Sequence, residues 1–267
     1  MNQKPNRLPL KLFVPVLLLC AATFTGCQKD VKNELKGSET NLTIRFTPVV
    51  RYDSVRMYFD TTTYTNRWSE SFIVKNFKFY IRAIRVTNTT TNQGFEIDVT
   101  KYYLVDFRDS ASALVKIGVL PGTYNRLSFI LGVDSTHNVS GAQTDALDPT
   151  HGMFWTWTTG YIFAKLEGTS PSSTAAGNMF MYHVGGFKQG EDANKEIQLF
   201  FPYNTGVTVS NGKNTVIDVT ADVYDWFGTP HDIKIAQKPT LMTPGAMALQ
   251  VADNYSKMFT VMGVKIE

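Results

Sequence analysis

The sequence predicts an all-β fold, an antiparallel β-sandwich of the immunoglobulin-like or Greek-key type with a short C-terminal helix. From Asn41 onward, short runs rich in Val, Ile, Thr, Tyr and Phe are separated by turn residues such as Gly, Pro, Asn and Asp. No long amphipathic helix pattern lies between these runs, which disfavours a parallel sheet with crossover helices. The 241 residues that follow the first 26 of the 267-residue chain suit one large β domain or two small ones.

Apolar periodicity assigns the individual strands. Leu42–Phe46 and Phe95–Val99 alternate apolar and polar residues, as half-buried strands do. The run 77–86 alternates through Ala83 and then changes phase, so we expect a β-bulge that restores one apolar face. Further strands are expected at 55–59, 102–107, 113–119, 123–133, 153–166, 178–184, 196–202, 205–210 and 214–224.

Turn and helix signals complete the predicted fold. Asn211-Gly212, between the strand candidates 207–209 and 216–219, predicts a β-hairpin. Residues 244–255 carry apolar side chains at helical spacing, with Thr243 as the expected N-cap and Pro244 at the first helical position.

The N-terminus predicts export and lipid attachment. Three basic residues precede the apolar run 12–22, which is about half the roughly 20 residues that a membrane-spanning helix needs. A spanning helix is the alternative, but the pattern favours an export signal over residues 1–26. Residues 24–27 resemble a lipobox, which makes Cys27 the acylated first residue of the mature protein and its attachment to a membrane.

The residues after Cys27 predict a solvated linker and a signal for localisation to the cell surface. Residues 27–40 are mostly charged or polar, as in a solvated linker, and lead into the expected domain at 41–267. The triplet Gln28-Lys29-Asp30 resembles the signal that sends Bacteroidetes lipoproteins to the cell surface. We therefore expect an outer-membrane lipoprotein that faces the cell exterior.

Composition excludes several chemistries. Cys20 lies in the leader and Cys27 would be acylated, so the mature chain has no thiol for a disulfide or a zinc–thiolate site. Three of the 26 basic residues lie in the leader, which leaves 23 against 23 acidic residues and a formal charge of zero. Nothing in this balance favours nucleic acid as a partner.

The sequence contains none of the familiar catalytic signatures, including His-Glu-x-x-His, Gly-x-Ser-x-Gly and Gly-x-Gly-x-x-Gly. Asp134 and Asp148 are expected to make turn and cap hydrogen bonds, and no base–nucleophile pair is visible, so we expect no enzyme. The four histidines show no local ligand spacing, and a single histidine is more often a surface or hydrogen-bonded residue than a ligand. The eight methionines after Met1 suit either Cu(I) or an irregular core.

The densest feature is the stretch 147–168, in which Met153, Trp155 and Trp157 would share one face of a strand. One interpretation is a core strand with an aromatic anchor, as β-sandwiches commonly have. The other is an aromatic wall that belongs to a binding site.

An ordered series of motifs runs over residues 41–260. It comprises Leu42–Phe46, Phe77–Ile84, Phe129–Asp134, Asn138, Leu147–Pro149 with Asp148, Gly152–Trp157, Gly160-Tyr161, Lys165–Gly168, His183–Gly185, and Val251–Tyr255 with Met258-Phe259. This series resembles the MbnP-like family, secreted bacterial proteins named for the partner of the methanobactin copper system. The resemblance implies a β-sandwich associated with copper. In the best-understood branch, a di-haem peroxidase-like partner enzyme oxidises a tryptophan to kynurenine, which helps to bind copper.

Carried onto this sequence, the resemblance implies His183 as a copper ligand, with Met153 and His151 nearby, and Trp155 or Trp157 as the oxidised tryptophan. The expected histidine two residues after the oxidised tryptophan is absent here, because no tryptophan of the chain is followed by one at that position. The main hypothesis is an extracytoplasmic copper-binding or copper-handling lipoprotein. The alternative is a cell-surface module that presents Trp155 and Trp157 to a glycan or a protein.

Overall fold

The computed structural model describes residue 1 and residues 38–267 except 52–55, 98, 142 and 157–158. The chain divides into two units, Met1–Asp30 and Val31–Glu267, and every element below lies in the second. Cys27 and Trp157 lie outside the described residues. The part of the chain described here contains no helix long and apolar enough to cross a bilayer.

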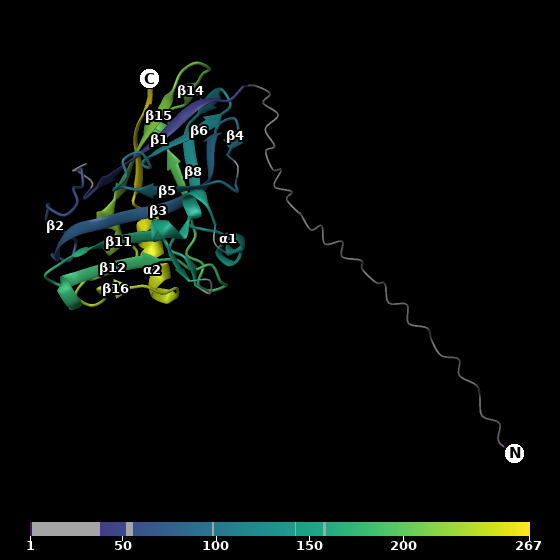
Figure 1. Cartoon of the computed structure of the whole chain (residues 1–267). Helices are drawn as coiled ribbons and strands as arrows, with labels where there is room; N and C mark the ends of the chain where they lie inside the picture. Colours follow the sequence, from purple (N-terminus) through teal and green to yellow (C-terminus); the bar gives the residue numbers. More distant parts are fainter. Residues whose placement is uncertain (2–37, 52–55, 98, 142, 157–158) are drawn as a thin grey trace. The chain divides into compact units, whose positions relative to one another are not determined.

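The described residues form mainly β structure (Figure 1). A four-stranded sheet has the order β17-β15-β1-β6, with β1 (Thr40–Val49), β6 (Leu114–Val119), β15 (Thr215–Asp222) and β17 (Phe259–Ile266). A nine-stranded sheet curls as a half-barrel and has β3 at its centre. Its strands are β2 (Tyr64–Thr65), β3 (Ser71–Asn88), β4 (Gln93–Glu96), β5 (Tyr102–Asp106), β8 (Arg126–Leu131), β11 (Ala164–Thr169), β12 (Met179–Val184), β13 (Lys195–Phe200) and β16 (Thr240–Leu241).

Two small strand pairs and several helices complete the domain. The pairs are β7 (Gly122–Tyr124) with β14 (Val207–Val209), and β9 (Phe154–Thr156) with β10 (Gly160–Tyr161). The α-helices are α1 (Ser135–Val139) and α2 (Ala246–Tyr255). The 3₁₀ helices are η1 (Asp145–Leu147), η2 (Pro149–His151), η3 (Ala176–Asn178), η4 (Pro202–Asn204) and η5 (Val223–Phe227).

The core lies between the two larger sheets and is strongly aromatic. Phe46 of β1 packs edge-to-face on Phe79 of β3 and Phe129 of β8, with ring centroids 5.6 and 6.0 Å apart. Phe259 of β17 contacts the same rings. Each such ring pair stabilises the fold by about 0.5–1.5 kcal/mol beyond the effect of burying its apolar area. This cluster therefore holds the two sheets together.

The predicted bulge in the long strand is confirmed. The pairing of β3 with β8 shifts register between Arg82 and Arg85, and Ala83 has a φ of 48°. Because the bulge absorbs the phase change, Ile81 and Ile84 are both buried despite their opposite parity.

The pairing of the strands differs from the prediction in two respects. The sheets are mixed rather than purely antiparallel, because β1 pairs β15 and β12 pairs β16 in parallel. Two parallel strands need a long connection between them, and the partners of both pairs are separated by long stretches of chain. The hairpin prediction at Asn211-Gly212 is also wrong, because both edges of β15 are occupied by β1 and β17, and β14 pairs β7 instead.

Element boundaries differ in several further places. The strand expected at 123–133 is divided between β7 and β8, which belong to different sheets. In the described part of 55–59, Arg56 forms only an isolated bridge to Val49. The single strand expected at 153–166 is divided among β9, β10 and the first part of β11. The C-terminal helix is present as predicted, but it begins at Ala246 with Gly245 in the N-cap position and no side-chain cap, so Thr243 does not cap it.

The bulge offers a test of the fold. We expect Ala83→Gly to raise the free energy of unfolding by about 0.5–1 kcal/mol, because a left-handed backbone is costly for alanine and not for glycine. Ala221→Gly is the control, since Ala221 is buried in β15 and has no positive φ, and it should lower stability. Urea denaturation measures both, and a loss of stability in Ala83→Gly would contradict this account of the bulge.

Candidate functional site

A polar cluster lies on the face of the nine-stranded sheet opposite the aromatic core. Directly opposed residues of neighbouring strands share one face of a sheet. Register places Lys78, Lys165 and His183 in one row across β3, β11 and β12, and Asn76, Glu167 and Met181 in the next. We call these six residues the outer-face cluster.

Glu167 is the centre of the outer-face cluster. Its Oε1 lies 2.6 Å from Nε2 of His183, and its Oε2 accepts a 3.0 Å hydrogen bond from Asn76 Nδ2. The hydrogen bond from His183 lowers the pKa of Glu167 to about 2, against the opposing effect of burial and with further help from Asn76 and Lys165. Glu167 is therefore an anion at neutral pH, although its side chain is only 21% exposed.

His183 is the buried partner in this pair. Its side chain is 8% exposed, and its Nδ1 is buried without a hydrogen-bond partner among the described residues. A buried nitrogen without a partner is unusual, because most buried polar atoms in proteins are hydrogen-bonded.

The segment around Gly152 covers the cluster. Lys165 Nζ donates to the Gly152 carbonyl at 2.5 Å, and Lys78 Nζ donates to the His151 carbonyl at 3.3 Å. Burial lowers the pKa of Lys165. These two bonds tie the start of β9 to the outer face.

Trp155 packs at the His183 end of this cover. A Cβ on Gly185, two residues after His183, would lie 2.4 Å from the Tyr161 carbonyl oxygen and 3.0 Å from Cζ3 of Trp155, so the β10 backbone and the indole together leave room only for glycine. Trp155 is half-buried, and its Nε1, like His183 Nδ1 and Asn76 Oδ1, is buried without a hydrogen-bond partner among the described residues.

The other predicted ligands are placed differently. Met153 is fully buried, and its carbonyl accepts from the Ile162 amide at 2.8 Å. The His151 imidazole is exposed and bonds through Nε2 to the Asp145 carbonyl at 2.9 Å. The backbone of His151 thus contacts the cluster, while its ring is bound elsewhere. Among the residues that the structure describes, no three His, Cys, Asp or Glu side chains gather as a metal-binding group.

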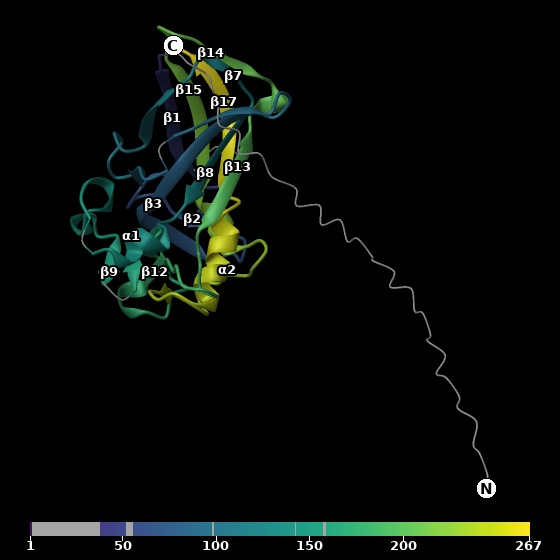
Figure 2. The same ribbon diagram turned by 90° about the vertical axis from the view of Figure 1, so that its right-hand side faces the viewer.

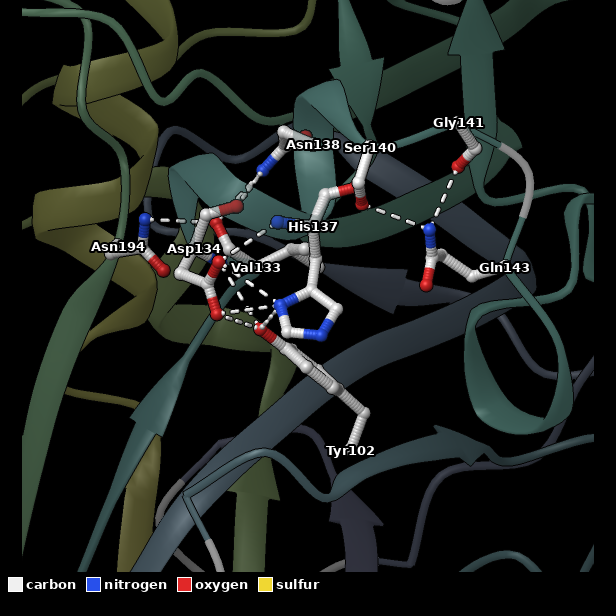
Figure 3. Close-up of polar contacts among 9 residues, drawn as sticks. All are labelled: Tyr102, Val133, Asp134, His137, Asn138, Ser140, Gly141, Gln143 and Asn194. Atoms are coloured by element: carbon white, nitrogen blue, oxygen red, sulfur yellow. Dashed lines mark hydrogen bonds and ion pairs between the residues drawn. The ribbon is translucent and has the colours of Figure 1, made fainter.

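The family-motif residues form a separate hydrogen-bond network. Asn138 Nδ2 donates to the carbonyls of Val133 and Asp134 at 2.9 and 2.8 Å (Figure 3). Its Oδ1 accepts from the Tyr161 amide at 2.8 Å. A Cβ on Gly160, whose φ is 75°, would lie 2.1 Å from that Oδ1. Asn138 therefore locks α1 to β10 and leaves no space for a side chain at position 160.

Two motif aspartates and a tyrosine stabilise the neighbouring turns. Asp134 accepts from the His137 amide at 2.9 Å and caps α1, and Asp148 accepts from the Thr150 amide at 2.8 Å and caps η2. These are the cap roles expected from the sequence. Tyr161 donates its hydroxyl to the Leu147 carbonyl at 2.6 Å, which fixes η1 against β10.

Sequence reasoning missed a triad of side chains at the start of α1. Tyr102 of β5 donates its hydroxyl to Asp134, and His137 Nδ1 lies 2.9 Å from the same carboxylate oxygen (Figure 3). Burial opposes ionisation of Asp134, but hydrogen bonds from Tyr102 and His137 outweigh it and lower its pKa. The spacing of Asp134 and His137 signals an N-cap, but no local pattern points to Tyr102, which is 32 residues away.

The fold and the site define a β-rich domain that carries a buried histidine–carboxylate pair on the outer face of its larger sheet. Residues 39–243 match the model of the MbnP family, so the chain belongs to that family and the resemblance found in the sequence is confirmed. Among solved structures, MbnP from Methylosinus trichosporium is similar in fold, with a TM-score of 0.52 and 13% identity over 85% of this chain and 99% of that one. A search of curated proteins found no match.

The motif lock predicts a stability effect. We expect Asn138→Ala to lower the free energy of unfolding by about 1–3 kcal/mol, because it leaves the buried Tyr161 amide without its acceptor. It also removes one of the two donors to each of the Val133 and Asp134 carbonyls, which keep Asn194 Nδ2 and the backbone amide of residue 138. Ser140→Ala, an exposed change in the same turn, should stay within about 0.5 kcal/mol of wild type. Equal urea midpoints for the two variants would show that the lock contributes nothing.

The low pKa of Glu167 predicts a specific loss of stability in acid. The folded pKa of Glu167, about 2, is below the ordinary value of 4.5, so its contribution to stability is complete above pH 4.5 and is lost as the pH falls towards 2. This loss is about 3 kcal/mol at 1.36 kcal/mol per pKa unit. Urea unfolding between pH 5 and 2, compared with Glu167→Gln, should show a shallower decline in the variant, and parallel curves would refute the pairing.

Proposed function

We propose that this protein is an extracytoplasmic copper-binding or copper-handling lipoprotein of the MbnP family. The observation that carries the proposal is the His183 imidazole. Its Nε2 is hydrogen-bonded to Glu167, and its Nδ1 is buried without a hydrogen-bond partner among the described residues.

The carboxylate decides which nitrogen of His183 is free. An ionised Glu167 can only accept hydrogen bonds, so Nε2 carries the proton in the neutral form of the ring, and Nδ1 then has a free lone pair. Histidines that bind metals usually donate their second nitrogen to a carboxylate in this way, which orients the ring and raises its basicity. His183 thus has the environment of a metal ligand.

The surrounding side chains favour a soft cation. Met181 is the preceding outer-face residue of β12, and the buried Met153 belongs to the covering segment. Imidazole and thioether groups together suit Cu(I), and a flexible Met side chain adapts readily to a ligand. His183 with Met153 or Met181 would hold the ion, and His151 could join only by giving up its bond to the Asp145 carbonyl. These side chains would give the protein its affinity for the ion, and the bound ion would supply redox chemistry. We propose no catalytic role for the protein side chains.

The location and the partner follow from the same proposal. Acylated Cys27 would anchor the domain to the outer membrane, with Gln28-Lys29-Asp30 directing it to the exterior. The partner that the family resemblance suggests is a di-haem peroxidase-like enzyme. Trp155 is the described candidate for oxidation, because its indole packs beside Gly185, close in sequence to His183.

The alternative, a surface module that binds glycans or proteins, needs exposed tryptophans. Trp155 is half-buried and packs against the core, so it does not offer a free aromatic platform. The described part of the site therefore favours copper.

Titration of the mature protein with Cu(I) against a competing chelator tests the proposal. We expect one copper ion per wild-type chain, no binding by His183→Ala, and about 10–100-fold weaker binding by Glu167→Gln, which loses the carboxylate that orients the ring. His231→Ala is the matched control and should bind as wild type does. Equal stoichiometry in His183→Ala would remove that residue from the site, and no binding by wild type would refute the copper function.

A further inference from the structure

We propose that the end of the domain at which the chain enters it rests on a lipid bilayer, with Tyr203 and Phe200 in the bilayer interface. The proposal rests on the lipid anchor proposed at Cys27. It adds a second contact with the membrane and fixes which end of the domain faces it.

The entry of the chain defines this end. Thr40, the first residue of β1, donates its hydroxyl to the carbonyl of Ser210 at 3.0 Å, and Asn214 pairs through its backbone with Glu267. The start of β1, the turn before β15 and the C-terminal residue are thus held together. Figures 1 and 2 show β14 and the C-terminus at this end, whereas Figure 1 shows β16 at the other. We call it the tether end.

The length of the connecting chain keeps the tether end near the membrane. Thirteen residues lead from Cys27 to Thr40. A chain of that length reaches at most about 45 Å when it is fully extended. The tether end is therefore the part of the domain that meets the bilayer most often.

The tether end presents a fully exposed aromatic residue. Tyr203 of η4 is 100% exposed and has a φ of 58°, a backbone conformation that costs a non-glycine residue about 1–2 kcal/mol. The segment is held firmly, because the Phe201 amide donates to the Asn125 carbonyl at 2.8 Å and Asn125 Nδ2 donates to Asn204 Oδ1 at 3.0 Å. The fold thus fixes Tyr203 in a position where its ring contributes nothing to the core.

Other apolar side chains accompany Tyr203. Phe200 at the end of β13 is 51% exposed, and Ile266 near the end of β17 is 50% exposed. The strand β17 packs beside both β13 and η4, which brings these residues to one side of the domain. Tyrosine is enriched at membrane–water interfaces because its ring is apolar and its hydroxyl is polar.

The charges at this end favour apolar insertion over attraction to anionic lipid. Two ion pairs combine both signs, Glu267 with Arg45 at 3.0 Å and Lys265 with Asp218 at 3.0 Å, and the Arg126 guanidinium lies 5.9 Å from the Phe200 ring centroid. Because screening by salt affects only the interactions between charges, the contact should persist at high ionic strength.

A spin label placed beside Tyr203 tests the proposal on the full acylated protein in phosphatidylcholine vesicles. Thr205→Cys gives an exposed labelling site in the turn and leaves Tyr203 and Phe200 in place. Met242→Cys, after β16 and 44% exposed, is the matched control at the other end. We expect the label at 205 to be protected several-fold from a water-soluble nickel relaxant and the label at 242 to remain accessible, at low and high salt alike.

Adding Tyr203→Ser and Phe200→Ser should abolish the protection at 205 while the acylated protein stays on the vesicles. Equal accessibility at 205 and 242 in the starting protein would overturn the proposal. Protection at 205 without vesicles would also overturn it, because it would indicate contact between copies of the chain. Intact mass, which reports acylation of Cys27, and the copper titration distinguish a failure here from a failure of the proposed function.

Discussion

The alternation of side chains along β3 is the constraint on which the rest of the structure depends. This strand pairs with strands on both sides, and one of its faces carries Phe77 and Phe79 into the aromatic core. The opposite face must then carry Asn76 and Lys78, which register aligns with Glu167 and Lys165. The same alternation that builds the core therefore places the polar cluster outside it, and the bulge at Ala83 keeps the apolar face continuous beyond it.

The outer-face cluster shows how a buried charge is retained. Burial alone would raise the pKa of Glu167, yet hydrogen bonds from His183 and Asn76 outweigh that cost and keep it ionised. A buried carboxylate with good partners is stable only while all of them remain. This dependence ties the ionisation of Glu167 to the packing of β3, β11 and β12.

Several motif residues position the elements around the site through hydrogen bonds. Asn138 holds the Tyr161 amide, and Tyr161 holds the Leu147 carbonyl, so α1, η1 and β10 form one unit. The same unit leads through β9 to Trp155 beside Gly185. Asn138 and Tyr161 thus position the segment that leads to Trp155 without being proposed ligands themselves. In Figure 2, β9 and β12 lie at the end of the domain opposite β14. A domain that met the membrane by its tether end would present this segment away from the lipid.

The sequence by itself determined the β-rich class, the bulge at Ala83, the C-terminal helix, the family and the cap roles of Asp134 and Asp148, because each follows from local periodicity, turn chemistry or an ordered motif. It also pointed to His183. Only the tertiary structure decided that β1 and β15 are parallel, that β14 pairs with β7 and not with β15, and that Tyr102 donates a hydrogen bond to Asp134. It also paired His183 with Glu167, 16 residues earlier in the chain. Such contacts depend on which strand edges remain free and how strands align, and neither is encoded in the local pattern.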